Sequence, residues 1–125
     1  MTPEEINRMQ GGGIQVERTP QVDTIDRNVF DATAVDWRSR MNPIKDQGTC
    51  NACWAFAATA AIEGRYAMKN GKKVILSEQQ MVDCDTSSNG CISGSSYSAL
   101  RYVKKAGGQV SSASYPYKAV KGSCT

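Results

Sequence analysis

The sequence contains no histidine among its 125 residues. Imidazole is a common general base in enzymes and a frequent ligand of zinc. Its absence excludes a Cys/His zinc site and an imidazole base within this chain. Any catalysis that depends on a histidine must therefore obtain it from polypeptide outside these residues.

Long hydrophobic runs and a strong net charge are also missing. No stretch approaches the roughly 20 apolar residues of a membrane helix. The formal net charge is only +3, so neither an anionic membrane nor a nucleic acid is expected as a partner. The polar, acidic start "MTPEEINRMQ" is not a signal peptide, which leaves a cytosolic protein or a targeting segment upstream of these residues. The length suits one modest domain.

Long alternating stretches typical of β-strands are absent, and helical patterns take their place. An alanine-rich helix is predicted over 53–69, with Gly71 as its C-terminal stop. The segment is apolar almost all round, which predicts a buried helix. Ser77 followed by Gln80 has the spacing of a capping box at the start of a second helix. A third helix is predicted within 95–108, "SSYSALRYVKKAGG", with lysines in its last turn.

The first 30 residues differ in composition from the rest. A short helical piece is predicted at 3–9, followed by the triple glycine "GGG" and an extended, weakly structured stretch. From "DATAVDWRSR" onward the composition is that of a globular domain. The body therefore reads as mainly helical, with loops in place of sheets.

Cysteine is plentiful: Cys50, Cys53, Cys84, Cys91 and Cys124. Five cysteines in a domain of this size suggest two disulfides and one leftover thiol, formed in an oxidising compartment.

The pair Cys50 and Cys53 forms a C-x-x-C motif that has several possible meanings. A zinc site would need a second knuckle, and the six-residue gap between Cys84 and Cys91 fits one poorly. A thioredoxin-like redox pair would need a preceding strand, and "MNPIKDQGT" is polar and turn-like. A nucleophile fits better, because Cys53 lies where the first helix begins. There, the helix dipole and unpaired backbone N–H groups favour the thiolate. The alternative is that Cys53 is a buried cysteine with a structural role only.

Five motifs in order carry a family resemblance: "VDWRSRMNPIKDQG", "QGTCNACWAF", "LSEQQMVDCD", "NGCISG" and "YPYKA". With them, the chain resembles papain-like cysteine proteases of the cathepsin L-like group. The resemblance implies an α+β papain-like fold, of which residues 30–125 are the mainly helical, disulfide-tied N-terminal lobe. Residues 1–29 resemble the C-terminal part of the family's propeptide. The β-rich C-terminal lobe is not represented.

The resemblance also implies roles for individual residues. Cys53 would be the nucleophile, and Gln47 would give a side-chain N–H to an oxyanion hole completed by the Cys53 backbone N–H. Trp54 would pack at the helix start. The implied disulfides are Cys50–Cys91 and Cys84–Cys124, with Cys53 free. The substrate-binding residues would be Asn51, Ser93, Gly94, Ser95 and Ser96, with Tyr97 near the subsite that dominates specificity.

Two departures from the family pattern lie beside the expected cleft. The family usually has "CGSCW", whereas Asn51 and Ala52 stand between the cysteines here. The side chain of Asn51 is expected to narrow the neighbouring subsite. Ile92 and Ser93 stand where Asn-Gly is common. The catalytic histidine and its asparagine would lie about 130–150 residues beyond the cysteine, and this chain does not reach them.

The function implied is that of a cysteine endopeptidase acting through an acyl-enzyme, present here without its catalytic histidine and asparagine. The alternative is a non-catalytic homologue that binds peptides or a protein partner. Expected partners are a peptide or protein substrate, the C-terminal lobe and cystatin-type inhibitors. No cofactor, metal, nucleic acid or membrane is expected. The family implies a secreted or lysosomal/endosomal location.

Overall fold

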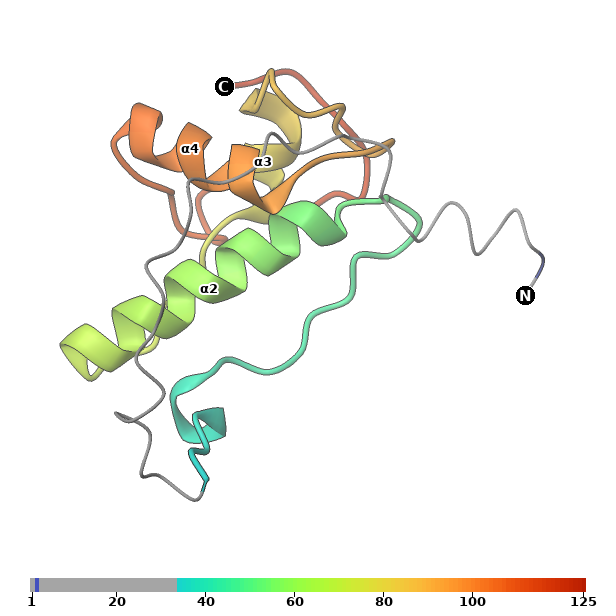
Figure 1. Cartoon of the computed structure of the whole chain (residues 1–125). Helices are drawn as coiled ribbons and strands as arrows, with labels where there is room; N and C mark the ends of the chain where they lie inside the picture. Colours follow the sequence, from blue (N-terminus) through green and yellow to red (C-terminus); the bar gives the residue numbers. More distant parts are fainter. Residues whose placement is uncertain (1, 3–33) are drawn as a thin grey trace, which may run out of the picture.

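The longest helix in the described part of the chain is α2 (Cys53–Asn70), and the other described elements are arranged around it (Figure 1). The computed structural model describes residue 2 and residues 34–125. The helical piece predicted at 3–9 and the extended stretch up to residue 29 lie outside the described residues. Helices α3 (Glu78–Cys84) and α4 (Ser96–Ala106) both pack against α2.

Helix α2 ends where the sequence predicted. Gly71 adopts a left-handed conformation with φ of 69°, and its N–H donates to the carbonyl of Ala67. The expectation of a helix buried all round was wrong. One face, including Trp54, Ala58 and Ala67, is buried, whereas the opposite face is exposed. Helices α3 and α4 and the segment with the 3₁₀ helix at Arg38–Arg40 contact α2, but they leave Ala57, Ala60 and Ala61 exposed.

Helix α3 shows half of the predicted capping box. Ser77 Oγ accepts a hydrogen bond from the Gln80 N–H at 3.1 Å. The reciprocal bond is missing, because the Gln80 side chain donates to the Tyr102 hydroxyl and accepts from the Val110 N–H. The Ser77 N–H donates instead to the carbonyl of Val110. The cap therefore ties α3 to α4 and to the chain that follows α4.

Helix α4 matches its prediction closely. It ends at Gly107, which has a φ of 80°, and Lys104 and Lys105 lie in its last turn. Ala99, fully buried, faces the core that α2 and α3 also line. Within residues 34–125 the only other regular elements are the 3₁₀ helix η2 (Arg38–Arg40) and two isolated β-bridges, as the lack of alternating segments predicted.

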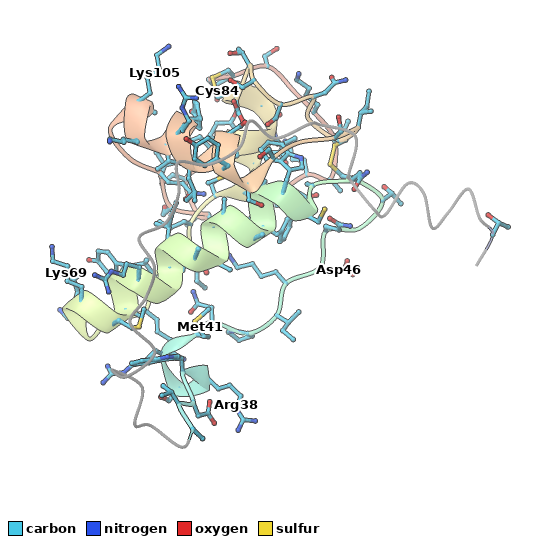
Figure 2. All side chains as sticks on the ribbon, in the orientation of Figure 1. Arg38, Met41, Asp46, Lys69, Cys84 and Lys105 are labelled. Carbon is cyan, nitrogen blue, oxygen red and sulfur yellow. A yellow bond between two sulfur atoms is a disulfide. The ribbon has the colours of Figure 1, made fainter. Side chains whose placement is uncertain are left out.

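Two disulfides fasten the loops to this helical frame. Cys50 bonds to Cys91 and Cys84 bonds to Cys124, which are the pairs that the family resemblance implied. Cys84 is the last residue of α3, and Figure 2 shows it far from Arg38. Cys53 is the free cysteine. None of the helices in the described part of the chain has the length and hydrophobicity of a membrane span.

Candidate functional site

A tight loop at residues 89–94 is held against the start of α2. The Cys50–Cys91 disulfide joins the two segments covalently, and the Asn51 N–H donates to the carbonyl of Cys91 at 3.1 Å. The indole N–H of Trp54 donates to the carbonyl of Gly90, also at 3.1 Å. These three links come from residues some 40 apart in the sequence, so the loop and the helix start form one unit.

Gly94 is required by the packing of Trp54 rather than by its backbone angles. A Cβ atom at position 94 would overlap the indole ring of Trp54. The indole is 3% exposed, with its N–H committed to Gly90, so it cannot easily move aside. Trp54 is therefore a core residue that also fixes the position of this loop, through its contacts with Gly90 and Gly94.

Cys53 is the first residue of α2 and is exposed, with a thiol that forms no disulfide. The residue before it, Ala52, has no side chain that could cap the helix. Within the described residues, no group accepts a hydrogen bond from the Cys53 N–H. An 18-residue helix therefore presents its positive end and an unpaired donor beside a free sulfur, a setting that favours negative charge.

Gln47 lies on a turn that precedes the helix. Asp46 Oδ1 accepts the N–H of Gly48 at 2.8 Å, and Gly48 has a φ of 61°. The hydroxyl of Tyr117 donates to the carbonyl of Gln47 at 2.8 Å, which links the turn to the C-terminal segment. The side-chain Oε1 of Gln47 is buried without a partner among the described residues. Its Nε2 is also free of hydrogen bonds to them, and it remains available as a donor.

Tyr117 is a supporting residue that the sequence analysis missed. The motif "YPYKA" was part of the resemblance, but no role was given to this side chain. Its ring meets Phe56 of α2 edge-on, with the ring centroids 4.9 Å apart. Burial raises the pKa of Tyr117 to about 12, and the negative charges of Glu78 and Asp46 act in the same direction. The phenol therefore stays protonated and keeps donating to Gln47.

The side chain of Asn51 is turned toward the loop at residues 89–94. The residue is 6% exposed. Its Nδ2 donates to the carbonyl of Ile92 at 3.1 Å, and its Oδ1 lies 3.9 Å from the sulfur of Cys53. The side chain is drawn inward because the disulfide next to it places the Ile92 carbonyl within reach.

The other candidate residues follow from the loop into α4. Ser93 accepts the Asn89 N–H at its carbonyl and is half-buried. Ser95 is buried at the start of α4, and Ser96, its first residue, is half-buried. Tyr97 points elsewhere: its ring lies under Arg101 and lines a hollow with residues of the Cys84 region. Loop 89–94 thus brings Ser93 and Gly94 to the start of α2, while Tyr97 turns toward another surface.

A buried ionic cluster lies behind the site. Lys45 Nζ bonds Glu63 Oε1 at 2.7 Å and Glu78 Oε1 at 2.6 Å, and both glutamates are 3% exposed. Burial alone would lower the pKa of Lys45, but the hydrogen bonds and charges of the two carboxylates together raise it. Asn42 and the N–H of Leu76 also donate to Glu63. The cluster joins the segment before the site to α2 and α3. Residues 34–125 include no group of acidic, cysteine or histidine side chains suited to a metal ion.

The chain belongs to the papain family of cysteine proteases, because residues 32–125 match the family described as "Papain family cysteine protease". Cysteine proteinase 3 of Entamoeba histolytica is 50% identical over 91 residues, which cover 73% of this chain and 30% of the relative. Digestive cysteine proteinase 1 of Homarus americanus is 41% identical over 129 residues, covering 99% of this chain and 40% of the relative. The chain therefore spans well under half the length of these relatives.

Solved structures show the same fold. Digestive procathepsin L2 proteinase from the larval midgut of Tenebrio molitor is 34% identical, with a TM-score of 0.89, over 100% of this chain and 44% of that one. Bromelain from Ananas comosus, in complex with the E64 inhibitor, is 43% identical with a TM-score of 0.69, over 73% of this chain and 43% of that one. The described residues are thus the helical N-terminal lobe of the papain-like fold, as the sequence analysis expected.

Proposed function

We propose that this chain is part of a cysteine endopeptidase whose nucleophile is Cys53. The observation that carries the proposal is the exposed, unpaired thiol at the N-terminus of α2, beside a backbone N–H with no partner in the described residues. The thiolate would attack a peptide carbonyl carbon, forming a tetrahedral oxyanion. Collapse would release the amine and leave an acyl-enzyme, which water then hydrolyses.

The oxyanion would be bound by two donors, the Cys53 N–H and the Nε2 of Gln47. Three features support Gln47 in this role. Its turn is fixed by the Asp46 bond to Gly48, its backbone is fixed by Tyr117, and its amide nitrogen is not used by other described residues. The backbone of Ser93 and Gly94 would line the substrate cleft, with Ser95 and Ser96 at its far side. Asn51 would contribute to the site through the contact of its Oδ1 with the sulfur of Cys53.

The base and its orienting asparagine would come from the C-terminal lobe, since this chain has no histidine. Exposed apolar residues on the segment before the site support such a partner. Ile44 is fully exposed, and Val35 and Trp37 are more than half exposed. Apolar side chains grouped on one segment are typical of a surface that another domain covers.

Residues 1–29 would be the end of a propeptide that is removed on activation. The similarity of the whole chain to a procathepsin supports this division. Two disulfides support a secreted or lysosomal location, since disulfides persist in oxidising compartments. Cystatin-type proteins would be candidate inhibitors of the assembled cleft.

Cleavage of a fluorogenic peptide tests the proposal, with the C-terminal lobe present and residues 1–29 removed. Turnover is expected, and Cys53→Ala should abolish it. Gln47→Ala should lower kcat by about 10²–10³-fold, as loss of one oxyanion donor does. Without the C-terminal lobe no cleavage is expected, because general acid–base help alone contributes about 10²–10⁴-fold. Peptide binding without cleavage would refute the proposal and favour the non-catalytic homologue.

A further inference from the structure

The carboxamide of Asn51 has an orientation that its surroundings dictate. A backbone carbonyl can only accept hydrogen bonds. The group 3.1 Å from the carbonyl of Ile92 must therefore be the Nδ2 of Asn51, which donates to it. The opposite atom, Oδ1, is then the one that lies 3.9 Å from the sulfur of Cys53. An amide turned the other way would bring two acceptors together at Ile92.

The position of this amide is also constrained on every side. Asn51 is 6% exposed, and its N–H is bonded to the carbonyl of Cys91. Its neighbour Cys50 is tied covalently to Cys91. The side chain therefore cannot swing into solvent without breaking the link to Ile92 inside a buried setting. Its carbonyl oxygen is a fixed negative dipole end beside Cys53.

Other charged groups around this segment are engaged elsewhere. Lys45 bonds to Glu63 and Glu78, and Asp46 bonds to the N–H of Gly48. Among the described residues, the Asn51 amide is the side-chain group that bonds to the Cys53 sulfur. Two influences thus act on that sulfur with opposite sign: the α2 N-terminus favours the thiolate, and an acceptor oxygen favours the thiol.

We propose that Asn51 is a positioning residue that holds Cys53 as a thiol, its Oδ1 accepting the S–H hydrogen bond. The thiolate has no proton to donate and faces the negative end of the amide dipole. Deprotonation therefore loses the bond and adds repulsion. The claim that the Asn51 amide slows the catalytic nucleophile rests on the proposed function. The hydrogen bond itself does not depend on that function.

The test measures alkylation of Cys53 by iodoacetamide in the full chain with both disulfides formed. The reaction joins sulfur to carbon, releases iodide and passes the thiol proton to solvent. Cys53 is the one cysteine outside the two disulfides, so labelling reports on one atom. The rate is followed from about pH 5 to pH 10 by mass spectrometry. No peptidase activity is involved, so failure here and failure of the proposed function are separate outcomes.

Asn51→Gly should move the midpoint of the pH–rate profile downward by about 0.5 to 1 unit, the effect of one modest hydrogen bond. Because the thiolate of a more acidic thiol is a weaker nucleophile, the two profiles should cross. The variant should react about two- to threefold faster below the midpoint and about two- to threefold slower on the plateau. A purely structural role would not produce this crossing.

Asn51→Asp should move the midpoint the opposite way, by about 1 unit or more, because it puts a full negative charge beside the sulfur. Asn89→Ala, on the same loop, is the matched control and should leave the profile unchanged, since its side chain forms none of the described bonds to Cys53. Correct disulfides in each variant are checked by peptide mapping. If Asn51→Gly does not fold, Asn51→Ala takes its place, with the same downward shift expected. An unchanged midpoint, or a shift of Asn51→Gly upward or Asn51→Asp downward, overturns the proposal.

Discussion

The two disulfides should be nearly equal in their effect on stability and unequal in their effect on Cys53. They close loops of nearly the same length, with sequence separations of 41 and 40 residues. In the chain-entropy treatment each cross-link then stabilises the fold by about 4 kcal/mol at 25 °C. Cys50→Ala/Cys91→Ala and Cys84→Ala/Cys124→Ala therefore form a matched pair of variants.

The two pairs differ in what they hold in place. Cys50–Cys91 fastens loop 89–94 to the start of α2, together with the bonds of Asn51. Cys84–Cys124 fastens the C-terminal segment to the end of α3, and Cys124 is exposed. Only the first pair lies next to the Cys53 sulfur. Its loss should release the Asn51 amide and alter the alkylation profile of Cys53.

Urea unfolding at low temperature, in a stabilising osmolyte, measures the first quantity, and iodoacetamide labelling measures the second. Each variant should lose about 4 kcal/mol, with about 1 kcal/mol more for the variant that lacks Cys50, which is 2% exposed and packs in the core. Because both cysteines of a pair are replaced, neither variant gains a free thiol, and Cys53 is the labelled group in both. Equal changes in Cys53 reactivity, or a stability loss below about 1 kcal/mol in either variant, would refute the reasoning.

Three smaller predictions follow from contacts around the site. Gly94→Ala should lower the free energy of unfolding in urea by about 1–3 kcal/mol, because the added Cβ meets the Trp54 ring. The control Ser93→Ala, at the neighbouring position, should cost less than half as much. Lys45→Met keeps the aliphatic stem but strands two buried carboxylates, and should cost about 3 kcal/mol at pH 7; a cost below 1 kcal/mol would mean that water already reaches them. Tyr117→Phe removes the bond to Gln47 and should cost about 1 kcal/mol at pH 7. Since folding raises the pKa of Tyr117 to about 12 from its ordinary value of 10.0, the wild type binds more protons folded than unfolded between these values. Its advantage over the Phe variant should therefore shrink as pH rises through that window, and an advantage that grew would contradict the assignment.

Local rules were sufficient for the ends of the helices. Gly71 and Gly107 stop α2 and α4 because glycine reaches the left-handed conformation without steric cost, and Ser77 starts α3 by accepting a hydrogen bond three residues away. These devices act within one turn of chain, so the order of residues alone reveals them. The odd number of cysteines likewise required a leftover thiol. The pairing of the others came from the family resemblance, since spacing alone leaves several connectivities open.

Tertiary structure decided what the side chains near Cys53 do. Asn51 is buried, and a carbonyl 41 residues away lies within reach of its amide. The side chain of Gln80 does not complete the predicted capping box, because it bonds to Tyr102 of α4 and to the N–H of Val110 instead. Glu63 is a charged residue in a largely apolar helix, and it is buried together with its bond to Lys45. In each case the partner is 18 or more residues distant, and a hydrogen bond over that separation exists only once the chain has folded.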